Sequence, residues 1–207
     1  MSLYFKYGAM NSSKSANMLM TRHNYIEQDF SVLLLKPVID TRGNKNIVSS
    51  RIGLSAPCVR ISDTTDIATL VSDYDVIMVD ECQFLTKEQV NLLYQLSFTK
   101  VILCYGLLTD FRRELFPGSK RLIELADSLQ EIKSVCRCGK RAVANARFDK
   151  YGNICLSGDQ IEIGSEEKYR ALCKECYEKE KKMVITRSGC GNGLAEHEAI
   201  EQVLGSL

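Results

Sequence analysis

The sequence predicts an α/β fold in which an open parallel sheet is flanked by helices and followed by a small cysteine-rich domain. Over the first 134 residues, short continuous apolar runs alternate with helix-like segments, as is typical of parallel strands buried on both faces. From residue 135 the sequence is rich in cysteine, glycine and charge, with only short apolar runs. We therefore expect two domains, residues 1–134 and 135–187, and a flexible or weakly helical tail at residues 188–207.

Each element of the first domain follows from a local pattern. Short apolar runs, several of them β-branched, predict the strands, at residues 3–7, 30–35, 76–79 and 101–104. Helix-like patterns between and after these runs predict the helices, at residues 13–27, 66–71, 87–96 and 119–127. Ligands of open α/β sheets bind at the carboxyl ends of the strands, so we expect the functional site along that edge.

Composition excludes several classes of protein. The net charge is +1, from 27 basic and 26 acidic side chains, and no basic stripe is evident, which disfavours a nucleic-acid polymer as partner. The apolar runs are far shorter than the roughly 20 residues that span a bilayer, and the N-terminus lacks the pattern of a signal peptide. We expect a cytoplasmic protein with no membrane segment, whose nine cysteines do not form a disulfide framework.

Residues 8–15 predict a loop that wraps phosphates. They match the P-loop pattern G-x-x-x-x-G-K-[ST], with a serine in place of the second glycine, and are Gly8, Ala9, Met10, Asn11, Ser12, Ser13, Lys14 and Ser15. The loop lies between a strand and a helix, where backbone N–H groups present positive partial charge to phosphates. Lys14 should bridge the β- and γ-phosphates of ATP, and Ser15 should ligate Mg²⁺. The alternative is an ordinary strand-to-helix turn with a serine N-cap and a solvated lysine.

The serine at position 13 has a calculable cost. If the loop requires positive φ there, a serine loses roughly 1 kcal/mol relative to glycine, by the steric argument. Such a cost is tolerable, so the substitution weakens the motif without excluding it.

A pair of carboxylates follows the strand at residues 76–79. Asp80, at a strand tip beside the phosphate loop, is placed to hold Mg²⁺. The adjacent Glu81 points the other way and is free to act as a base. The alternative is an ordinary N-cap for the next helix, but Thr86 suits that role better.

Four cysteines predict a structural zinc site. They come in two pairs with metal-ligand spacing, Cys136 with Cys138 and Cys173 with Cys176. The alternative is four reduced structural cysteines. The segment between the pairs, residues 139–172, is longer than the usual spacing of about 15–20 residues. We interpret it as a mobile loop, pinned at its base by zinc, that covers a substrate.

Together these motifs resemble the thymidine kinase family, in the zinc-containing class of bacterial and vertebrate cytosolic enzymes. The resemblance covers about residues 3–180. Besides the cysteine pairs and Tyr169, its markers are residues 8–15, 40–42, 48–53, 79–84, 105–112 and 161–164. This sequence departs from the pattern at Ser13 and at Ser165, where glycines are common.

The resemblance implies a reaction and its participants. ATP would phosphorylate the 5′-hydroxyl of thymidine to give dTMP, in nucleotide salvage for DNA synthesis. Glu81 would be the general base, with Mg²⁺ and structural Zn²⁺ as metals and with Arg42 and Arg51 as candidates to assist the transfer. The family is usually a homotetramer and is inhibited by its end product, dTTP.

The resemblance also implies two sets of binding residues. The ATP set is the phosphate loop together with Asp80, Glu81, Cys82 and Gln83. The thymidine set is Met10, Asp40, Arg42, Phe84, Leu107, Phe111, Arg147, Gln160, Ile161, Glu162, Ile163, Gly164 and Tyr169. Met10, Phe84, Leu107 and Phe111 would wall the thymine, although Phe84 or Phe111 taken singly is more often a core residue. Tyr169 would pack on the nucleoside, and backbone groups of residues 160–165 would bond the pyrimidine edge.

Two other functions remain open. A nucleotide-binding regulatory protein could keep the fold and the zinc but have lost turnover through Ser13. The pair of Asp80 and Glu81 favours the enzyme, because a pure binder needs no base. A zinc-ribbon nucleic-acid module is disfavoured by the near-neutral charge.

Overall fold

A six-stranded parallel sheet forms the centre of the computed structural model, which describes residues 1–41, 46–160 and 168–189. Its strand order is β5-β2-β6-β7-β1-β8, and every neighbouring pair is parallel. The strands are β1 Ser2–Tyr7, β2 Val32–Pro37, β5 Val59–Ile61, β6 Val76–Val79, β7 Val101–Gly106 and β8 Ser128–Glu131. The prediction of an open parallel α/β sheet is therefore confirmed.

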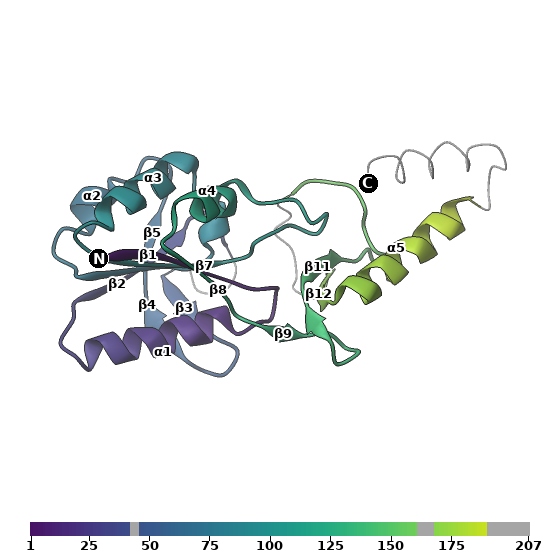
Figure 1. Cartoon of the computed structure of the whole chain (residues 1–207), viewed down its shortest axis with the longest axis horizontal. Helices are drawn as coiled ribbons and strands as arrows, with labels where there is room; N and C mark the ends of the chain where they lie inside the picture. The colour runs from purple at the N-terminus through teal and green to yellow at the C-terminus, as the bar shows by residue number, and fades with distance from the viewer. Residues whose placement is uncertain (42–45, 161–167, 190–207) are drawn as a thin grey trace.

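Helices cover both faces of this sheet. Helix α1 (Lys14–Ile26) lies on one face, while α2 (Ile67–Leu70), α3 (Lys87–Leu96) and α4 (Pro117–Leu125) lie on the other (Figure 1). The residues of strand β6 are all apolar because both faces of the strand are buried. Ile77 and Val79 belong to the core under α2, α3 and α4, and Val76 and Met78 belong to the core above α1. Each such fully buried side chain stabilises the fold by about 1.5–3 kcal/mol.

The predicted elements all occur, with ends shifted by a few residues, but two strands of the sheet were not predicted from the sequence. Strand β5 has only three residues and exposes Val59, and β8 at the other edge has two exposed residues out of four. Neither gives the continuous apolar run by which the inner strands were recognised. A hairpin of β3 (Ile47–Ser49) and β4 (Ser55–Pro57) packs beside α1.

The start of α3 shows which residue caps that helix. The Thr86 hydroxyl accepts a hydrogen bond from the Gln89 backbone N–H at 3.2 Å, and the Gln89 side chain accepts one from the Thr86 N–H at 3.0 Å. This reciprocal pair is a capping box. Thr86 is therefore the cap, as expected, and the two carboxylates after β6 are left for another role.

The cysteine-rich region, by which we mean residues 133–160 and 168–189, lies beside the carboxyl ends of the sheet strands (Figure 1). It contains the pair β9 (Ser134–Val135) and β10 (Arg141–Ala142), the pair β11 (Ala144–Arg147) and β12 (Tyr169–Leu172), and helix α5 (Lys174–Gly189). Much of the segment between the cysteine pairs is thus a packed hairpin, with Ala144, Ala146, Phe148 and Leu172 in its core, rather than one long loop. The two-domain division with a separate tail stays a prediction, and residues 190–207 lie outside the described residues.

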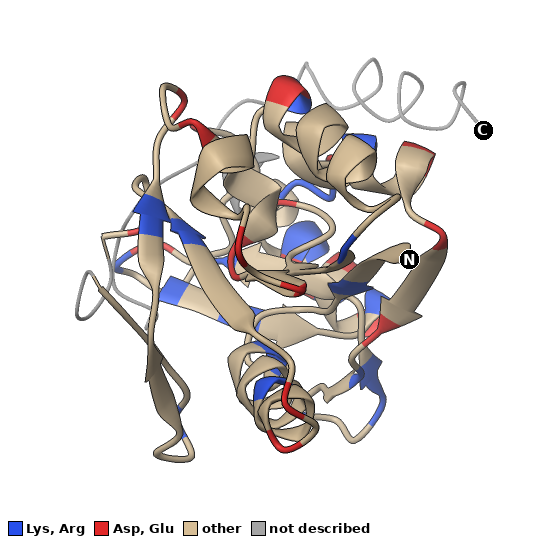
Figure 2. Cartoon of the chain, turned by 90° about the vertical axis from the view of Figure 1, so that its left-hand side faces the viewer, with Lys and Arg blue, Asp and Glu red and all other residues tan. Residues whose placement is uncertain are grey.

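The surface is mixed in charge. Figure 2 shows basic and acidic positions interspersed on the side in view, in keeping with a net charge of +1. Among the helices that the structure describes, none has both the length and the apolar character needed to cross a membrane.

Candidate active site

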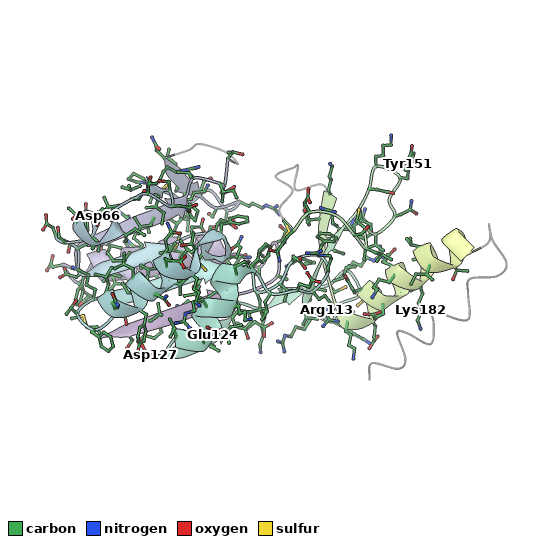
Figure 3. The ribbon with its side chains drawn as sticks, turned by 90° about the horizontal axis from the view of Figure 1, so that it is seen from above. Asp66, Arg113, Glu124, Asp127, Tyr151 and Lys182 are labelled. Atoms are coloured by element: carbon green, nitrogen blue, oxygen red, sulfur yellow. The ribbon has the colours of Figure 1, made fainter. Side chains whose placement is uncertain are left out.

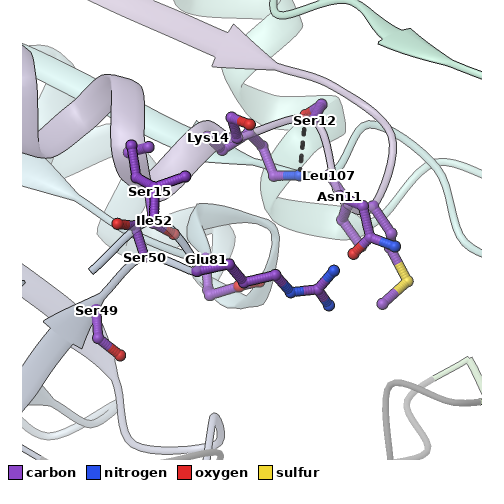
Figure 4. A pocket seen from close by; sticks show the side chains of 13 residues that line it. Asn11, Ser12, Lys14, Ser15, Ser49, Ser50, Ile52, Glu81 and Leu107 are labelled. Carbon is purple, nitrogen blue, oxygen red and sulfur yellow. Dashed lines mark hydrogen bonds between the residues drawn. The ribbon is translucent and has the colours of Figure 1, made fainter. Parts of the chain in front are cut away.

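A cavity of about 170 Å³ lies at the carboxyl ends of β1, β6 and β7. Its walls are the phosphate loop and first helical residues (10–16), the turn of the β3–β4 hairpin (49–52), Glu81 and Leu107. Figure 4 shows Lys14, Ser15 and Glu81 around this one space. Parallel strands bring their carboxyl ends to the same edge of a sheet, so motifs far apart in sequence meet there.

The phosphate loop has a strained backbone at position 13, where the sequence raised that possibility, and also at position 11, where it did not. Ser13 has φ 60° and Asn11 has φ 62°, both in the left-handed region. Such a conformation costs a serine about 1 kcal/mol. Gly8 at the start of the loop has no room for a side chain, because a Cβ would collide with the Ile132 carbonyl oxygen and the Ser12 hydroxyl.

Lys14 extends over the loop that precedes it. Its Nζ donates to the carbonyl oxygens of Ala9 (2.9 Å) and Gly8 (3.3 Å) and to the Ser12 hydroxyl (3.4 Å; Figure 4). The ammonium charge is therefore held at the centre of the loop, where a phosphate cradled by the backbone N–H groups would meet it. A solvated surface lysine, the alternative, does not describe this arrangement.

Ser15 and Asp80 together offer oxygen atoms that could ligate a metal ion beside Lys14. The Ser15 hydroxyl lies 3.3 Å and 3.5 Å from the two carboxylate oxygens of Asp80, and Asp80 is buried. Burial raises the pKa of the Asp80 carboxyl to about 7, and the negative charge of Glu81 adds to the rise. A cation would relieve both effects, and a hydroxyl with a carboxylate is the kind of donor set that Mg²⁺ prefers. These residues therefore fit a magnesium ion.

Glu81 is held in place by a buried amide. Its backbone has φ 52°, and strain of this kind is concentrated at functional sites. The Gln83 amide donates to the Glu81 carboxylate at 2.6 Å, while its oxygen accepts from the Leu107 N–H at 3.0 Å. Gly106 makes room for this amide, since a Cβ there would lie 2.5 Å from the Gln83 oxygen.

The four cysteine sulfurs of the two pairs lie within 4.8 Å of one another. The sulfurs of Cys138 and Cys173 are 3.5 Å apart. In a tetrahedral site with zinc–sulfur bonds of about 2.3 Å, the ligand sulfurs are about 3.8 Å apart. Burial opposes ionisation of Cys136, but hydrogen bonds from the Cys138 and Cys173 backbones and from neighbouring thiols outweigh it and lower its pKa to about 6. This cluster could hold a zinc ion, as its spacing predicted.

The comparison with protein families rests on nearly the whole chain, since the family model described as "Thymidine kinase" matches residues 1–177. The chain belongs to the thymidine kinase family. It is 41% identical over 186 residues to a thymidine kinase of Legionella pneumophila (strain Lens), covering 86% of this chain and 89% of that protein. It is 43% identical over 180 residues to one of Zymomonas mobilis, covering 83% of this chain and 93% of that protein. The expected family is confirmed, and the chain is a kinase.

Among the residues that the family resemblance implied at ATP, five do not line the cavity, namely Gly8, Ala9, Asp80, Cys82 and Gln83. Cys82 has no exposed surface and packs in the sheet core. Gln83 is only 2% exposed and lies behind Glu81. Gln83 was expected as a ligand residue, but it holds the Glu81 carboxylate instead, a contact that could not be predicted because nothing local in the sequence pairs Gln83 with Leu107.

The residues expected to bind thymidine fall into three groups according to where they lie in the structure. Met10 and Leu107 line the cavity. Phe84 packs edge-on against Phe116, with ring centroids 6.0 Å apart, and Phe111 is buried with the Arg147 guanidinium 3.8 Å above its ring. For this thymidine kinase family member, the wall role of the two phenylalanines stays a prediction.

The third group consists of residues outside the lining of the cavity beside the phosphate loop. Asp40 is buried in an ion pair with Lys36 at 2.9 Å, and Tyr169 lines a separate cavity that reaches the phosphate loop at residues 11–13. The Gln160 amide donates to the Asp110 carboxylate at 3.2 Å. Five expected residues lie outside the described residues, namely Arg42, Ile161, Glu162, Ile163 and Gly164.

Proposed function

We propose that this protein transfers the γ-phosphoryl group of ATP to the 5′-hydroxyl of thymidine, which yields dTMP and ADP. The observation that carries the proposal is that Lys14, Ser15 and Glu81 line one cavity. An alcohol is too weakly acidic to attack a phosphate without help, so a kinase that acts on one benefits from a carboxylate beside its phosphate loop. The matched relatives are named thymidine kinases, which supports thymidine as the acceptor.

In the proposed reaction, Glu81 takes the proton of the 5′-hydroxyl while that oxygen forms its bond to the γ-phosphorus. The bond from the γ-phosphorus to the bridging oxygen breaks, and ADP leaves with the electron pair. Lys14 stabilises the negative charge on the transferred group, and Arg51 at the cavity wall assists. Mg²⁺, held by Ser15 and Asp80, would supply further charge neutralisation of the phosphates.

Nucleoside selection is proposed to come from apolar walls and backbone groups. Met10 and Leu107 offer apolar surface to the thymine ring and its methyl. Backbone groups of residues 160–165 are proposed to bond the pyrimidine edge. A molecule with the thymidine base and three phosphates would occupy both the nucleoside and the phosphate positions, so we propose that dTTP inhibits the enzyme.

The family relationship is also the basis on which we propose the pathway, the compartment, the metal and the oligomeric state of the enzyme. We infer nucleotide salvage in the cytoplasm, structural zinc on the four cysteines, and a homotetramer. The homotetramer is inferred from the family relationship alone. Light scattering would test the tetramer, and a monomer at micromolar concentration would contradict it.

A substrate panel tests the proposed reaction. The protein is incubated with Mg²⁺, ATP labelled at the γ-phosphate and each of the four deoxynucleosides in turn. We expect labelled dTMP from thymidine and much less product from the deoxynucleosides of adenine, guanine and cytosine. Tight nucleotide binding without any labelled product would reject the enzyme and favour the nucleotide-binding regulatory protein. Phosphorylation of another deoxynucleoside in preference to thymidine would reject the substrate.

A further inference from the structure

The cysteine-rich region is joined to the loop that follows β7. The Tyr177 hydroxyl on α5 donates to the Phe111 carbonyl at 2.6 Å, in a buried contact. Arg113 in the same loop lies 4.0 Å from the Glu178 carboxylate, and Figure 3 shows Arg113 where the loop meets α5. Ala9 of the phosphate loop also packs against the core of the cysteine-rich region. The region therefore contacts the machinery of the active site directly.

Asn145 makes the polar part of this junction. It lies on β11, opposite Ala171 of β12, and only 4% of it is exposed. Its side-chain oxygen accepts a hydrogen bond from the Met10 backbone N–H at 2.7 Å, and its amide donates to the Thr109 carbonyl at 2.9 Å. One buried side chain thus bridges the phosphate loop and the loop after β7, using both of its hydrogen-bonding groups.

The phosphate loop needs external support. Asn11 and Ser13 both have positive φ without being glycine, and such conformations persist only where the surroundings over-determine them. Within the loop, the Ser12 N–H reaches the Ala9 carbonyl at a long 3.3 Å. The 2.7 Å bond from Met10 to Asn145 is shorter, and it fixes the loop just before its first strained residue.

We propose that Asn145 is a positioning residue for nucleotide binding, through which the cysteine-rich region keeps the phosphate loop in its binding shape. The proposal rests on the proposed use of ATP. Asn145 acts through Met10 and touches no phosphate itself. Without it, the Met10 N–H loses its buried acceptor and the loop relaxes toward less strained conformations, in which fewer of its N–H groups converge on one phosphate.

The test measures the affinity of the whole protein for ADP with Mg²⁺ by titration calorimetry, alongside the thermal midpoint. Asn145→Leu has nearly the same size but makes no hydrogen bond, and Asn145→Ala serves as the second variant if the leucine disturbs packing. Tyr177→Phe is the matched control, since it removes one buried hydrogen bond between the same two parts of the molecule but none at the phosphate loop.

We expect Asn145→Leu and Asn145→Ala to weaken ADP binding about tenfold, which corresponds to about 1.4 kcal/mol. Tyr177→Phe should lower the thermal midpoint yet change ADP affinity less than about twofold. Equal loss of affinity in all three variants, or unchanged affinity in both Asn145 variants, would overturn the positioning role. Failure of the unmodified protein to bind ADP would instead reject the use of ATP, and the positioning role with it.

Discussion

The buried amide of Gln83 is predicted to be necessary for turnover. Gln83→Leu keeps the volume of the side chain but removes its hydrogen bonds to the Glu81 carboxylate (2.6 Å) and from the Leu107 N–H (3.0 Å). The Leu107 N–H is left without this acceptor, which should cost about 1–3 kcal/mol of stability. For a chain of this size, each kcal/mol lowers the thermal midpoint by about 2–4 °C.

The effect on catalysis should be separate from the effect on stability. A base freed from its orienting partner is misplaced relative to the 5′-hydroxyl, and a misplacement of about 1 Å can cost about 100-fold. We expect kcat to fall about 10- to 100-fold, equivalent to about 1.4–2.7 kcal/mol of barrier. KM for ATP should change little, because the phosphate loop is untouched.

The control is Gln89→Leu. Gln89 is also a buried glutamine with two hydrogen bonds, to the Thr86 N–H at 3.0 Å and the Ser62 carbonyl at 2.9 Å, but it belongs to the cap of α3. The Gln89→Leu variant should lose about as much stability as Gln83→Leu but keep the kcat of the unmodified protein. Steady-state kinetics and thermal melts on both variants decide the matter. If Gln83→Leu turns over normally, or if both variants lose the same share of activity, the positioning role assigned to Gln83 is wrong.

Three further predictions concern the loop, the base and the metal. Glu81→Gln should reduce kcat about 10²- to 10⁴-fold while ADP affinity persists; an unchanged kcat in steady-state assays would remove Glu81 as the base. Ser13→Gly should raise the thermal midpoint by up to about 2–4 °C, because glycine adopts left-handed φ without the steric cost; a lower midpoint would contradict the strain assigned to that position. Cys173→Ala, or chelation, should release zinc and weaken thymidine binding, measured by elemental analysis and by KM for thymidine; a native protein without zinc would end that claim.

The parts of this molecule that the sequence predicted well are those determined by near neighbours. The inner strands were visible because a strand buried on both faces must be continuously apolar, as at residues 76–79. Thr86 was identifiable as a cap because its partner Gln89 lies three residues away. The left-handed shape of Ser13 could be anticipated as a possibility, because the usual residue at its place in the motif is glycine.

The parts that could not be predicted depend on residues that are distant in sequence. Met10 and Asn145 are 135 positions apart, and no local pattern indicates that a buried asparagine on a hairpin will meet a phosphate loop. Gln83 was placed in the site by family resemblance, but its partner at Leu107 is known only once β6 and β7 are aligned. The edge strand β8 was missed because none of its four residues is buried, which leaves no continuous apolar run.

The position of β1 has a consequence for how the chain folds during synthesis. This strand is made well before its two partners, since it lies between β7 and β8, with Ser2 opposite Val101 and Tyr4 opposite Ser128. At a translation rate of about 5–20 residues per second, its partners emerge several seconds later. Until then the strand that leads into the phosphate loop has unpaired edges, which exposes it to aggregation.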